Sequence, residues 1–332
     1  MNKSLHIPVL LHEVLQTLEP KPGSLFVDGT FGNGGYSRAF LEAGAEVIAL
    51  DCDPAAIAAG QDLVQQAQGR FTLLQKNFSQ LKEIFDTEQK GRAPDAIILD
   101  IGVSSMQLDQ ALRGFSFQKD GPLHMRMSQQ GPNAADVINE YSAKDLARIF
   151  YCLGEEKWAR PIAYAIEKAR QQQKICSTLA LAQLIEKVRP KKFNERIHPA
   201  TRVFQALRIY VNDELRALLQ ALFAAEQVLP PGGRLGVVSF HSLEDRIVKR
   251  FFASRSQKAM PSRYAPYQEG KEPSFSLLFK GVKAPQLQEI EHNPRARSAK
   301  LRVGVRRQAL PYPAEEGFFS LPLLPPLKQI SG

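Results

Sequence analysis

Apolar, strand-like segments alternate with helical patterns through the first hundred residues of the chain. SLFVDGT (24–30), EVIALD (46–51), FTLLQKNF (71–78) and DAIILD (95–100) read as strands, and a helical pattern follows each of the first three. Asp53 is placed to cap the helix after the second strand. Strands that are joined through helices pair in parallel, and helices then cover both faces of their sheet. We therefore expect an α/β fold with a mostly parallel, Rossmann-like sheet.

The alternation stops in the middle of the chain and resumes toward its carboxyl end. Between residues 136 and 210 the patterns are helical, whereas NDELRALLQALFAAEQVLPPGG (212–233) and RLGVVSF (234–240) again read as a helix and a strand. FSLLFKG (275–281) and KLRVGVRR (300–307) are candidates for a closing pair of strands. We expect three parts: an α/β domain of residues 1–107 and 213–310, an all-α insertion of residues 108–212, and a peripheral, proline-rich tail of residues 311–332.

The formal net charge of +9 is unevenly distributed along the chain. Residues 108–212 have 17 basic against 10 acidic side chains, and residues 240–310 have 15 against 6, whereas residues 1–107 have 8 against 13. One interpretation is an ordinary solvated surface. The other, which we favour, is a binding surface for a polyanion such as RNA beside a neutral or acidic pocket for a small molecule.

Cysteine usage and hydropathy indicate a cytoplasmic protein. The three cysteines lie far apart and form no CxxC pair, which is typical of a reducing compartment. No apolar run reaches the roughly 18 residues that span a bilayer, and polar residues interrupt the apolar amino-terminal segment. The six histidines show neither HxxxH nor HExxH spacing, so we expect no metal site.

A glycine-rich turn, GNGG (32–35), joins the first strand to a helix. Its spacing does not fit the GxGxxG of dinucleotide sites, and it lacks the lysine of a phosphate-binding loop. Asp28, Asp51 and Asp100 each end a strand, and ligands of open α/β sheets bind at these carboxyl ends. Asp51, nineteen residues after Gly32, is placed to accept hydrogen bonds from both hydroxyls of a ribose.

A ligand with a ribose, an adenine and a positive centre but no phosphate fits these residues, and S-adenosylmethionine is such a ligand. Phe78, after the third strand, either packs in the core or offers an apolar surface to the adenine. Asp28 and Asp100 have the alternative role of capping helices.

Six stretches carry a resemblance to one family, and the strings FQALRI, FHSLEDR and NPRARS within them are long and chemically unusual. The six stretches are DGTFGNGGYSR, DIGVSSMQLD, RGFSFQKDGPL, HPATRVFQALRI, PGGRLGVVSFHSLEDRIVKRFF and NPRARSAKLR. Together with HIPVLLHEV near the amino terminus, they resemble the RsmH (MraW) family of ribosomal RNA small subunit methyltransferases. The resemblance covers almost the whole chain, to about residue 303.

The resemblance implies a class I methyltransferase sheet with a helical domain inserted after the fourth strand. It implies transfer of a methyl group from S-adenosylmethionine to the exocyclic N4 amine of a cytidine in the decoding region of 16S rRNA, in the small ribosomal subunit. Carried over motif by motif, it implies cofactor contacts from Gly34, Gly35, Tyr36, Asp51, Phe78, Asp100 and Gln107.

The chain departs from the family pattern at four positions. Tyr36 stands where the family commonly has histidine, and a backbone contact survives that change. Met106 replaces the usual proline, and His124 and Ser128 stand where two aspartates are usual.

The proposed reaction asks for a hydrogen-bond acceptor beside the target amine. Cytosine's exocyclic amine is a poor nucleophile because its lone pair is delocalised, and an acceptor for one N–H localises that pair and later takes the proton. Asp100 has the position at which amino-methyltransferases hold the amine, and Ser104 and Ser105 are candidates to bind the edge of the base. His241, after the fifth strand, is a second candidate for the base or its proton, or else a hydrogen-bonded histidine at a strand end.

Arginines of the insertion are candidates to bind RNA phosphates. Arg126, Arg202 and Arg208 are in this group, although Arg202 and Arg208 share a helix and have the alternative of pairing with acids. Three other functions remain open: a nicotinamide dehydrogenase, which the glycine spacing disfavours, a cofactor-free RNA-binding module, and a DNA cytosine methyltransferase, whose [DS]PPY string is missing.

Overall fold

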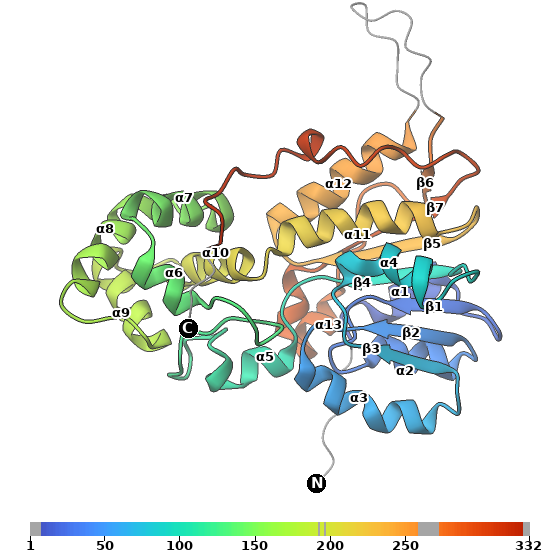
Figure 1. The fold of residues 1–332 in the computed structure, drawn as a ribbon, viewed down its shortest axis with the longest axis horizontal. Coiled ribbons are helices and arrows are strands. Elements are labelled where there is room, and N and C mark those ends of the chain that lie inside the picture. Colours follow the sequence, from blue (N-terminus) through green and yellow to red (C-terminus); the bar gives the residue numbers. More distant parts are fainter. Residues whose placement is uncertain (1–7, 192, 196, 258–271, 328–332) are drawn as a thin grey trace, which may run out of the picture. The chain divides into compact units, whose positions relative to one another are not determined.

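The computed structural model describes residues 8–191, 193–195, 197–257 and 272–327. It divides into two compact units, which Figure 1 traces along the chain. One unit consists of the residues up to Gly102 and of residues 215–320, and we call it the sheet unit. The other consists of residues 103–214 and of the segment that begins at Leu321, and we call it the helical unit.

The sheet unit is built on one sheet, which has seven strands within the described residues. The strands are β1 (Leu25–Asp28), β2 (Glu46–Leu50), β3 (Phe71–Leu74), β4 (Ala96–Asp100), β5 (Arg234–Ser239), β6 (Phe275–Leu277) and β7 (Lys300–Arg306). Their order in the sheet is β3-β2-β1-β4-β5-β7-β6. The pairs from β3 to β5 are parallel, whereas β7 pairs antiparallel with both β5 and β6. The order reverses between β1 and β4, which makes their carboxyl ends the switch point at which ligands of such sheets bind.

The expected strands are confirmed, and their burial explains why they could be predicted from the sequence. All four residues of β1 and the first four of β4 are buried in succession, so both faces of these strands are covered. The third strand ends at Leu74, earlier than the expected residue 78, because Asn77 caps a short 3₁₀ turn over Phe78–Gln80. Asp53 accepts a hydrogen bond from the N–H of Ala55 at 3.0 Å and caps the next helix, as expected.

Helices of the sheet unit pack on the strands. They are α1 (Leu11–Leu18), α2 (Gly35–Glu42), α3 (Pro54–Gln66), α4 (Leu81–Thr87), α11 (Glu214–Val228, whose first residue is assigned to the helical unit), α12 (Ser242–Ser256) and α13 (Leu287–His292). Helix α2 contacts β1 and β2, α3 contacts β3, and α12 contacts β5, β6 and β7. The side chains that fill the centre of this core include Phe26, Phe40, Ile48, Phe251 and Phe275.

The helical unit contains α5 (Ser105–Asp109), α6 (Ala134–Glu140), α7 (Ala143–Gly154), α8 (Ala159–Arg170), α9 (Thr178–Val188) and α10 (Thr201–Val211). Helix α7 packs on both α8 and α10. Gly154 marks the close approach of α7 to α10, because a Cβ there would lie 2.4 Å from the carbonyl oxygen of Arg202. This unit corresponds to the expected all-α insertion.

The division into units falls at slightly different residues from those expected. The first boundary lies at residue 102 instead of 107, because the backbone of Ile101 still donates to Val238 of β5 at 2.9 Å. The larger difference concerns the tail. Residues 311–320 belong to the sheet unit, where Phe319 is 2% exposed and its carbonyl accepts a hydrogen bond from Arg250 at 3.1 Å.

The last described residues, 321–327, pack on the helical unit. The hydroxyl of Tyr210 donates to the carbonyl of Pro325 at 2.7 Å, and that of Tyr141 donates to Pro326 at 3.1 Å. The described tail is mostly exposed, and contacts at Phe319, Pro325 and Pro326 anchor it. Within the part of the chain that is described, no helix has the length and apolar character needed to cross a membrane.

Candidate active site

The glycine turn runs from the end of β1 into α2 and is held to both neighbouring strands. The backbone N–H of Gly29 donates to Ile98 of β4, and that of Phe31 donates to Leu50 of β2, each at 2.9 Å. A side chain at Gly29 would collide with the core, since its Cβ would lie 2.4 Å from Leu99. Gly34 has a φ of 73°, a conformation that favours glycine. The turn is therefore a rigid backbone feature at the switch point.

Asp28, at the end of β1, is buried and forms hydrogen bonds within the protein, as a residue with a structural role does. It is fully buried and accepts hydrogen bonds from Ser37 Oγ at 2.7 Å and from the N–H of Thr30 at 3.2 Å. Burial raises its pKa from 3.8 to about 6, while the hydrogen bond from Ser37 opposes this rise. Its contacts tie the strand to the turn and to the first turns of α2.

Asp51, after β2, is partly exposed and preorganised by the backbone. Its Oδ2 accepts a hydrogen bond from the N–H of Gly32 and its Oδ1 one from the N–H of Asp53, both at 2.8 Å. Each carboxylate oxygen has a second acceptor position. A ligand diol would therefore meet a carboxylate whose orientation is already fixed.

Asp100, at the end of β4, has an unsatisfied oxygen. Its backbone N–H donates to Thr30 Oγ1 at 2.7 Å, but its Oδ1 is buried and accepts a hydrogen bond from no described residue. Burial, reinforced by the negative charges of Asp28 and Glu244, raises the pKa of Asp100 well above its ordinary value. A buried acceptor without a donor fits a ligand or substrate that brings an N–H.

The side chain of Tyr36 is buried and is used within the protein, so it does not contact a ligand. Its buried hydroxyl donates to the carbonyl of Val9, in the segment that precedes α1. The same segment covers Gly35, because a Cβ at that glycine would lie 2.2 Å from Pro8. Burial raises the pKa of Tyr36 well above its ordinary value, with Asp100 adding to the effect. A cofactor contact at Tyr36 is therefore left to its backbone, as the sequence led us to expect.

Phe78 begins the 3₁₀ turn after β3 and is partly exposed. A Cβ added at Gly29 would lie 3.5 Å from the Cβ of Phe78. The side chain of Phe78 therefore begins next to the residue that follows β1. Asp28, Asp51, Phe78, Asp100 and the glycine turn thus come from four neighbouring strand ends of the sheet unit.

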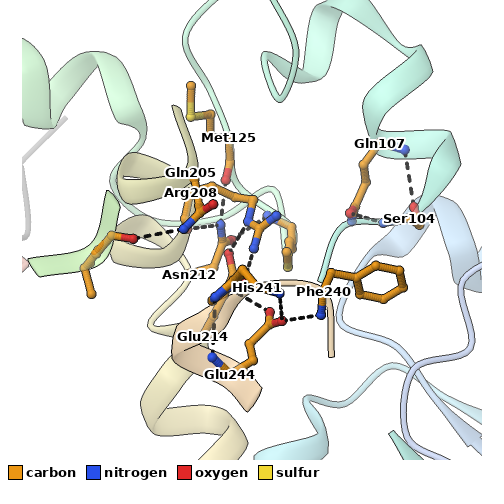
Figure 2. A network of polar contacts seen from close by, with 12 residues as sticks. Ser104, Gln107, Met125, Gln205, Arg208, Asn212, Glu214, Phe240, His241 and Glu244 are labelled. Carbon is orange, nitrogen blue, oxygen red and sulfur yellow. Dashed lines mark hydrogen bonds and ion pairs between the residues drawn. The ribbon is translucent and has the colours of Figure 1, made fainter. Parts of the chain in front are cut away.

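His241 caps α12 together with an acid that the sequence reasoning missed (Figure 2). Its Nδ1 accepts the N–H of Glu244 at 3.4 Å, and its Nε2 lies 2.9 Å from Glu244 Oε1. The other carboxylate oxygen accepts the N–H groups of Phe240 at 2.8 Å and of His241 at 3.2 Å. A capping box, with the acid three residues after the cap, is the local signal that predicts this arrangement.

The remaining predicted residues, Ser104, Ser105 and Gln107, belong to the helical unit. Ser104 caps α5, since its Oγ accepts the N–H of Gln107 at 3.3 Å while Gln107 Oε1 accepts the N–H of Ser104 at 3.1 Å (Figure 2). Ser105 is the first residue of that helix and is partly exposed. Gln107 is almost fully buried.

Asn212 fixes the loop of the helical unit in which His124 and Ser128 differ from the family pattern. Its Nδ2 donates to the carbonyl of Met125 at 2.7 Å, and its Oδ1 accepts the N–H of Met127 at 2.8 Å (Figure 2). Arg208 forms a two-bond ion pair with Glu214 at 2.8 Å for each bond. Arg208, one of the arginines expected to bind RNA phosphates, is therefore paired with Glu214 instead.

A family model and two named relatives match this chain in sequence. A family model described as the MraW methylase family matches residues 3–307. A protein of Rhizobium leguminosarum bv. trifolii named Ribosomal RNA small subunit methyltransferase H is 56% identical over 327 residues, which cover 98% of this chain and 95% of that protein. A protein of the same name from Rhizobium rhizogenes is 57% identical over 327 residues, with the same coverage. Among solved structures, an rRNA methylase from Streptococcus thermophilus is 13% identical, with 90% of this chain and 94% of that chain covered and a TM-score of 0.41.

Proposed function

Because the chain belongs to the MraW methylase family, we propose that it transfers a methyl group from S-adenosylmethionine to the exocyclic N4 amine of a cytidine in the decoding region of 16S rRNA. The names of the relatives support the ribosomal substrate. One observation supports an amine as the methyl acceptor. The buried Oδ1 of Asp100, at the switch point of the sheet, accepts a hydrogen bond from no described residue, and an amine could donate one.

S-adenosylmethionine is the methyl donor, and the strand ends fit it. Asp51 would accept the ribose hydroxyls, and the backbone of Gly34, Gly35 and Tyr36 would contact the cofactor where the turn enters α2. Phe78 would offer its ring to the adenine. A neutral nucleoside with a cationic sulfonium suits this set of carboxylates better than a pyrophosphate would. The bound cofactor supplies an electrophilic methyl carbon and leaves as a neutral thioether.

Asp100 would accept an N–H of the cytosine amine and then its proton. Burial and the neighbouring acids raise its pKa, which makes its carboxylate a stronger proton acceptor than an ordinary aspartate. A nearby sulfonium cation would favour the ionised form of the same group. Ser104 and Ser105 remain proposed contacts to the base, and Gln107 a proposed cofactor contact, on the strength of the sequence motif. His241, whose ring nitrogens both face Glu244, supports the fold of this region.

The RNA would be held through the basic regions of the chain. The insertion and residues 240–310 have the excess of lysine and arginine, and phosphate contacts supply most of the sequence-independent affinity for RNA. The target base must leave its stack before its amine is accessible. We place this activity in the cytoplasm.

The product identifies the reaction. Small ribosomal subunits that lack the modification are incubated with the protein and isotopically labelled S-adenosylmethionine, and the 16S rRNA is digested to nucleosides for mass analysis. We expect labelled N4-methylcytidine from a single position. Label in 5-methylcytidine, in another nucleoside or in DNA supplied as a competitor would contradict the proposal.

A further inference from the structure

Helices α7 and α8 lie in the helical unit (Figure 1). Their exposed side chains include cations and tyrosines. On these two helices, all of whose residues are described, every charged side chain that is exposed is a lysine or an arginine. Two tyrosines accompany them, Tyr151 at 66% and Tyr164 at 64% exposure. We call the set Lys144, Arg148, Tyr151, Arg160, Tyr164 and Lys168 the α7–α8 face.

The spacing of these residues gathers them into one stripe on each helix. On α7 they follow one another at intervals of four and three residues, and on α8 at intervals of four. Side chains three or four positions apart lie on the same side of a helix. Each stripe therefore offers two cations and one tyrosine.

The two helices form an antiparallel hairpin, which brings the stripes to the same levels. Residues 155–158 connect them, and the N–H of Ala143 at the start of α7 donates to Glu167 Oε1 near the end of α8 at 3.0 Å. By this register Arg148 lies at about the level of Tyr164, and Tyr151 at about the level of Arg160. An aromatic ring and a guanidinium thus share each of these two levels, and Lys144 and Lys168 share the third.

Three acidic side chains of the hairpin make their polar contacts with groups other than these cations. Asp145 accepts a hydrogen bond from the Ser142 hydroxyl at the cap of α7, Glu167 is held by the start of α7, and Glu156 is buried. Glu155 is exposed, at the turn between the helices. Among the described residues, the four cations of the α7–α8 face have no ion-pair partner.

We propose that the α7–α8 face binds single-stranded RNA, with phosphates against the four cations and unpaired bases stacked on Tyr151 and Tyr164. Charge complementarity selects a polyanion, and exposed aromatic rings select unpaired bases, because bases within a duplex are not free to stack on protein. The inference deepens the proposed function, since it assigns the surface of the helical unit that holds the ribosomal substrate.

Binding to a labelled single-stranded RNA of about 12 nucleotides, a length within known single-strand binding sites, tests the inference. The full chain is titrated into this RNA, and into the corresponding duplex, at several salt concentrations with fluorescence anisotropy as readout. We expect the quadruple variant K144Q/R148Q/R160Q/K168Q to reduce the slope of log Kd against log salt by about three, at about 0.7 for each lost contact. Tyr164→Ala should raise Kd by about 5-fold or more, whereas Tyr164→Phe should not.

A matched control has the same loss of charge elsewhere in the unit. The variant K119Q/K174Q/K187Q/K191Q removes four exposed lysines outside the two helices. It should change the salt slope by less than one, and thermal unfolding should show that both quadruple variants fold. Equal losses of RNA affinity in the two quadruple variants, wild-type affinity in Tyr164→Ala, or tighter binding of the duplex would each overturn the inference.

This outcome is separable from that of the proposed function. RNA affinity that depends on the α7–α8 face, with a methylated product other than N4-methylcytidine, would retain the surface and reject the chemistry. N4-methylcytidine as product, with RNA affinity indifferent to the α7–α8 face, would reject the surface alone.

Discussion

Glu244 Oε1 lies 2.9 Å from Nε2 of His241, and the backbone N–H of Glu244 lies 3.4 Å from Nδ1 of the same ring. Both nitrogens of this histidine therefore face one residue. The carboxylate also accepts the N–H groups of Phe240 and His241, so a single buried acid organises the passage from β5 into α12.

The cap predicts how substitutions of His241 behave. Asparagine is a strong helix-capping residue, so His241→Asn should keep the unfolding free energy within about 0.5 kcal/mol and keep methyl transfer within a few-fold. Alanine cannot cap, and His241→Ala should cost about 1 kcal/mol. Urea unfolding and a methyl-transfer assay check both variants. A folded His241→Asn protein that has lost transfer by 100-fold or more would show that the imidazole acts on the base.

Asp51 should dominate the affinity for the cofactor. Two backbone N–H groups hold its carboxylate in a fixed orientation, and we propose that this carboxylate accepts the ribose hydroxyls. Asp51→Asn loses a charge-assisted acceptor, which is worth about 1.5–3 kcal/mol, or about 10- to 100-fold in Kd. Isothermal titration with S-adenosylmethionine measures the change.

The neighbouring Asp53→Asn variant is the control for Asp51. Asparagine can accept the N–H of Ala55 that Asp53 accepts now, so the cap of α3 and the cofactor affinity should both survive. If the two variants bind the cofactor equally well, Asp51 does not hold the ribose.

The raised pKa of Asp28 should make the protein less stable as the pH rises. Its pKa is 3.8 in the unfolded reference and about 6 in the folded protein, because burial disfavours the charge. The folded state binds this proton more tightly, so the contribution to stability is complete below pH 4 and is lost as the pH rises through 6. A change of about two pKa units corresponds to about 3 kcal/mol.

Comparison with Asp28→Asn isolates that contribution. The unfolding free energy of the wild type minus that of the variant should decrease by about 2.4 kcal/mol between pH 4 and pH 7. Urea unfolding at a series of pH values gives this difference. A difference that stays constant over the range would mean that the carboxyl does not titrate in the folded core.

The carboxyl-terminal segment should stabilise the sheet unit through Phe319. This side chain is 2% exposed and packs beside Arg255 and Phe223, whereas the adjacent Phe318 is 56% exposed. Phe319→Ala should therefore cost about 3 kcal/mol, and Phe318→Ala less than about 0.5 kcal/mol. Denaturant unfolding distinguishes them, and equal effects of the two substitutions would contradict the anchoring of the tail.

Local patterns were sufficient to predict much of the sheet unit. Except for β3, where only Phe71 is buried, each parallel strand is a short apolar run that is almost fully buried on both faces, and such runs can be recognised in the sequence without knowing their partners. The cap at Asp53 was equally readable, because capping depends on residues two or three positions away. The same reasoning predicted that Asp28, Asp51 and Asp100 gather at strand ends.

Contacts between distant residues were not readable in this way. The packing of Pro8 on Gly35, the hydrogen bond from Tyr36 to Val9 and the burial of Phe319 join segments that no local pattern connects. The residue type also could not predict that three aspartates at equivalent strand ends have different environments. Asp28 is satisfied by Ser37, Asp51 by the backbone, and Asp100 keeps a buried oxygen without a donor, a difference that depends on the folded surroundings.

The rate of a single turnover in Asp100→Asn tests the central claim most directly. Pre-formed enzyme–cofactor complex is mixed with excess small subunits, and transfer of the labelled methyl group is followed in time at saturating cofactor. The account predicts a rate lower by at least about 100-fold, with the Kd for S-adenosylmethionine raised by no more than about 10-fold. A wild-type rate in this variant would contradict the claim that Asp100 receives the cytosine amine and its proton.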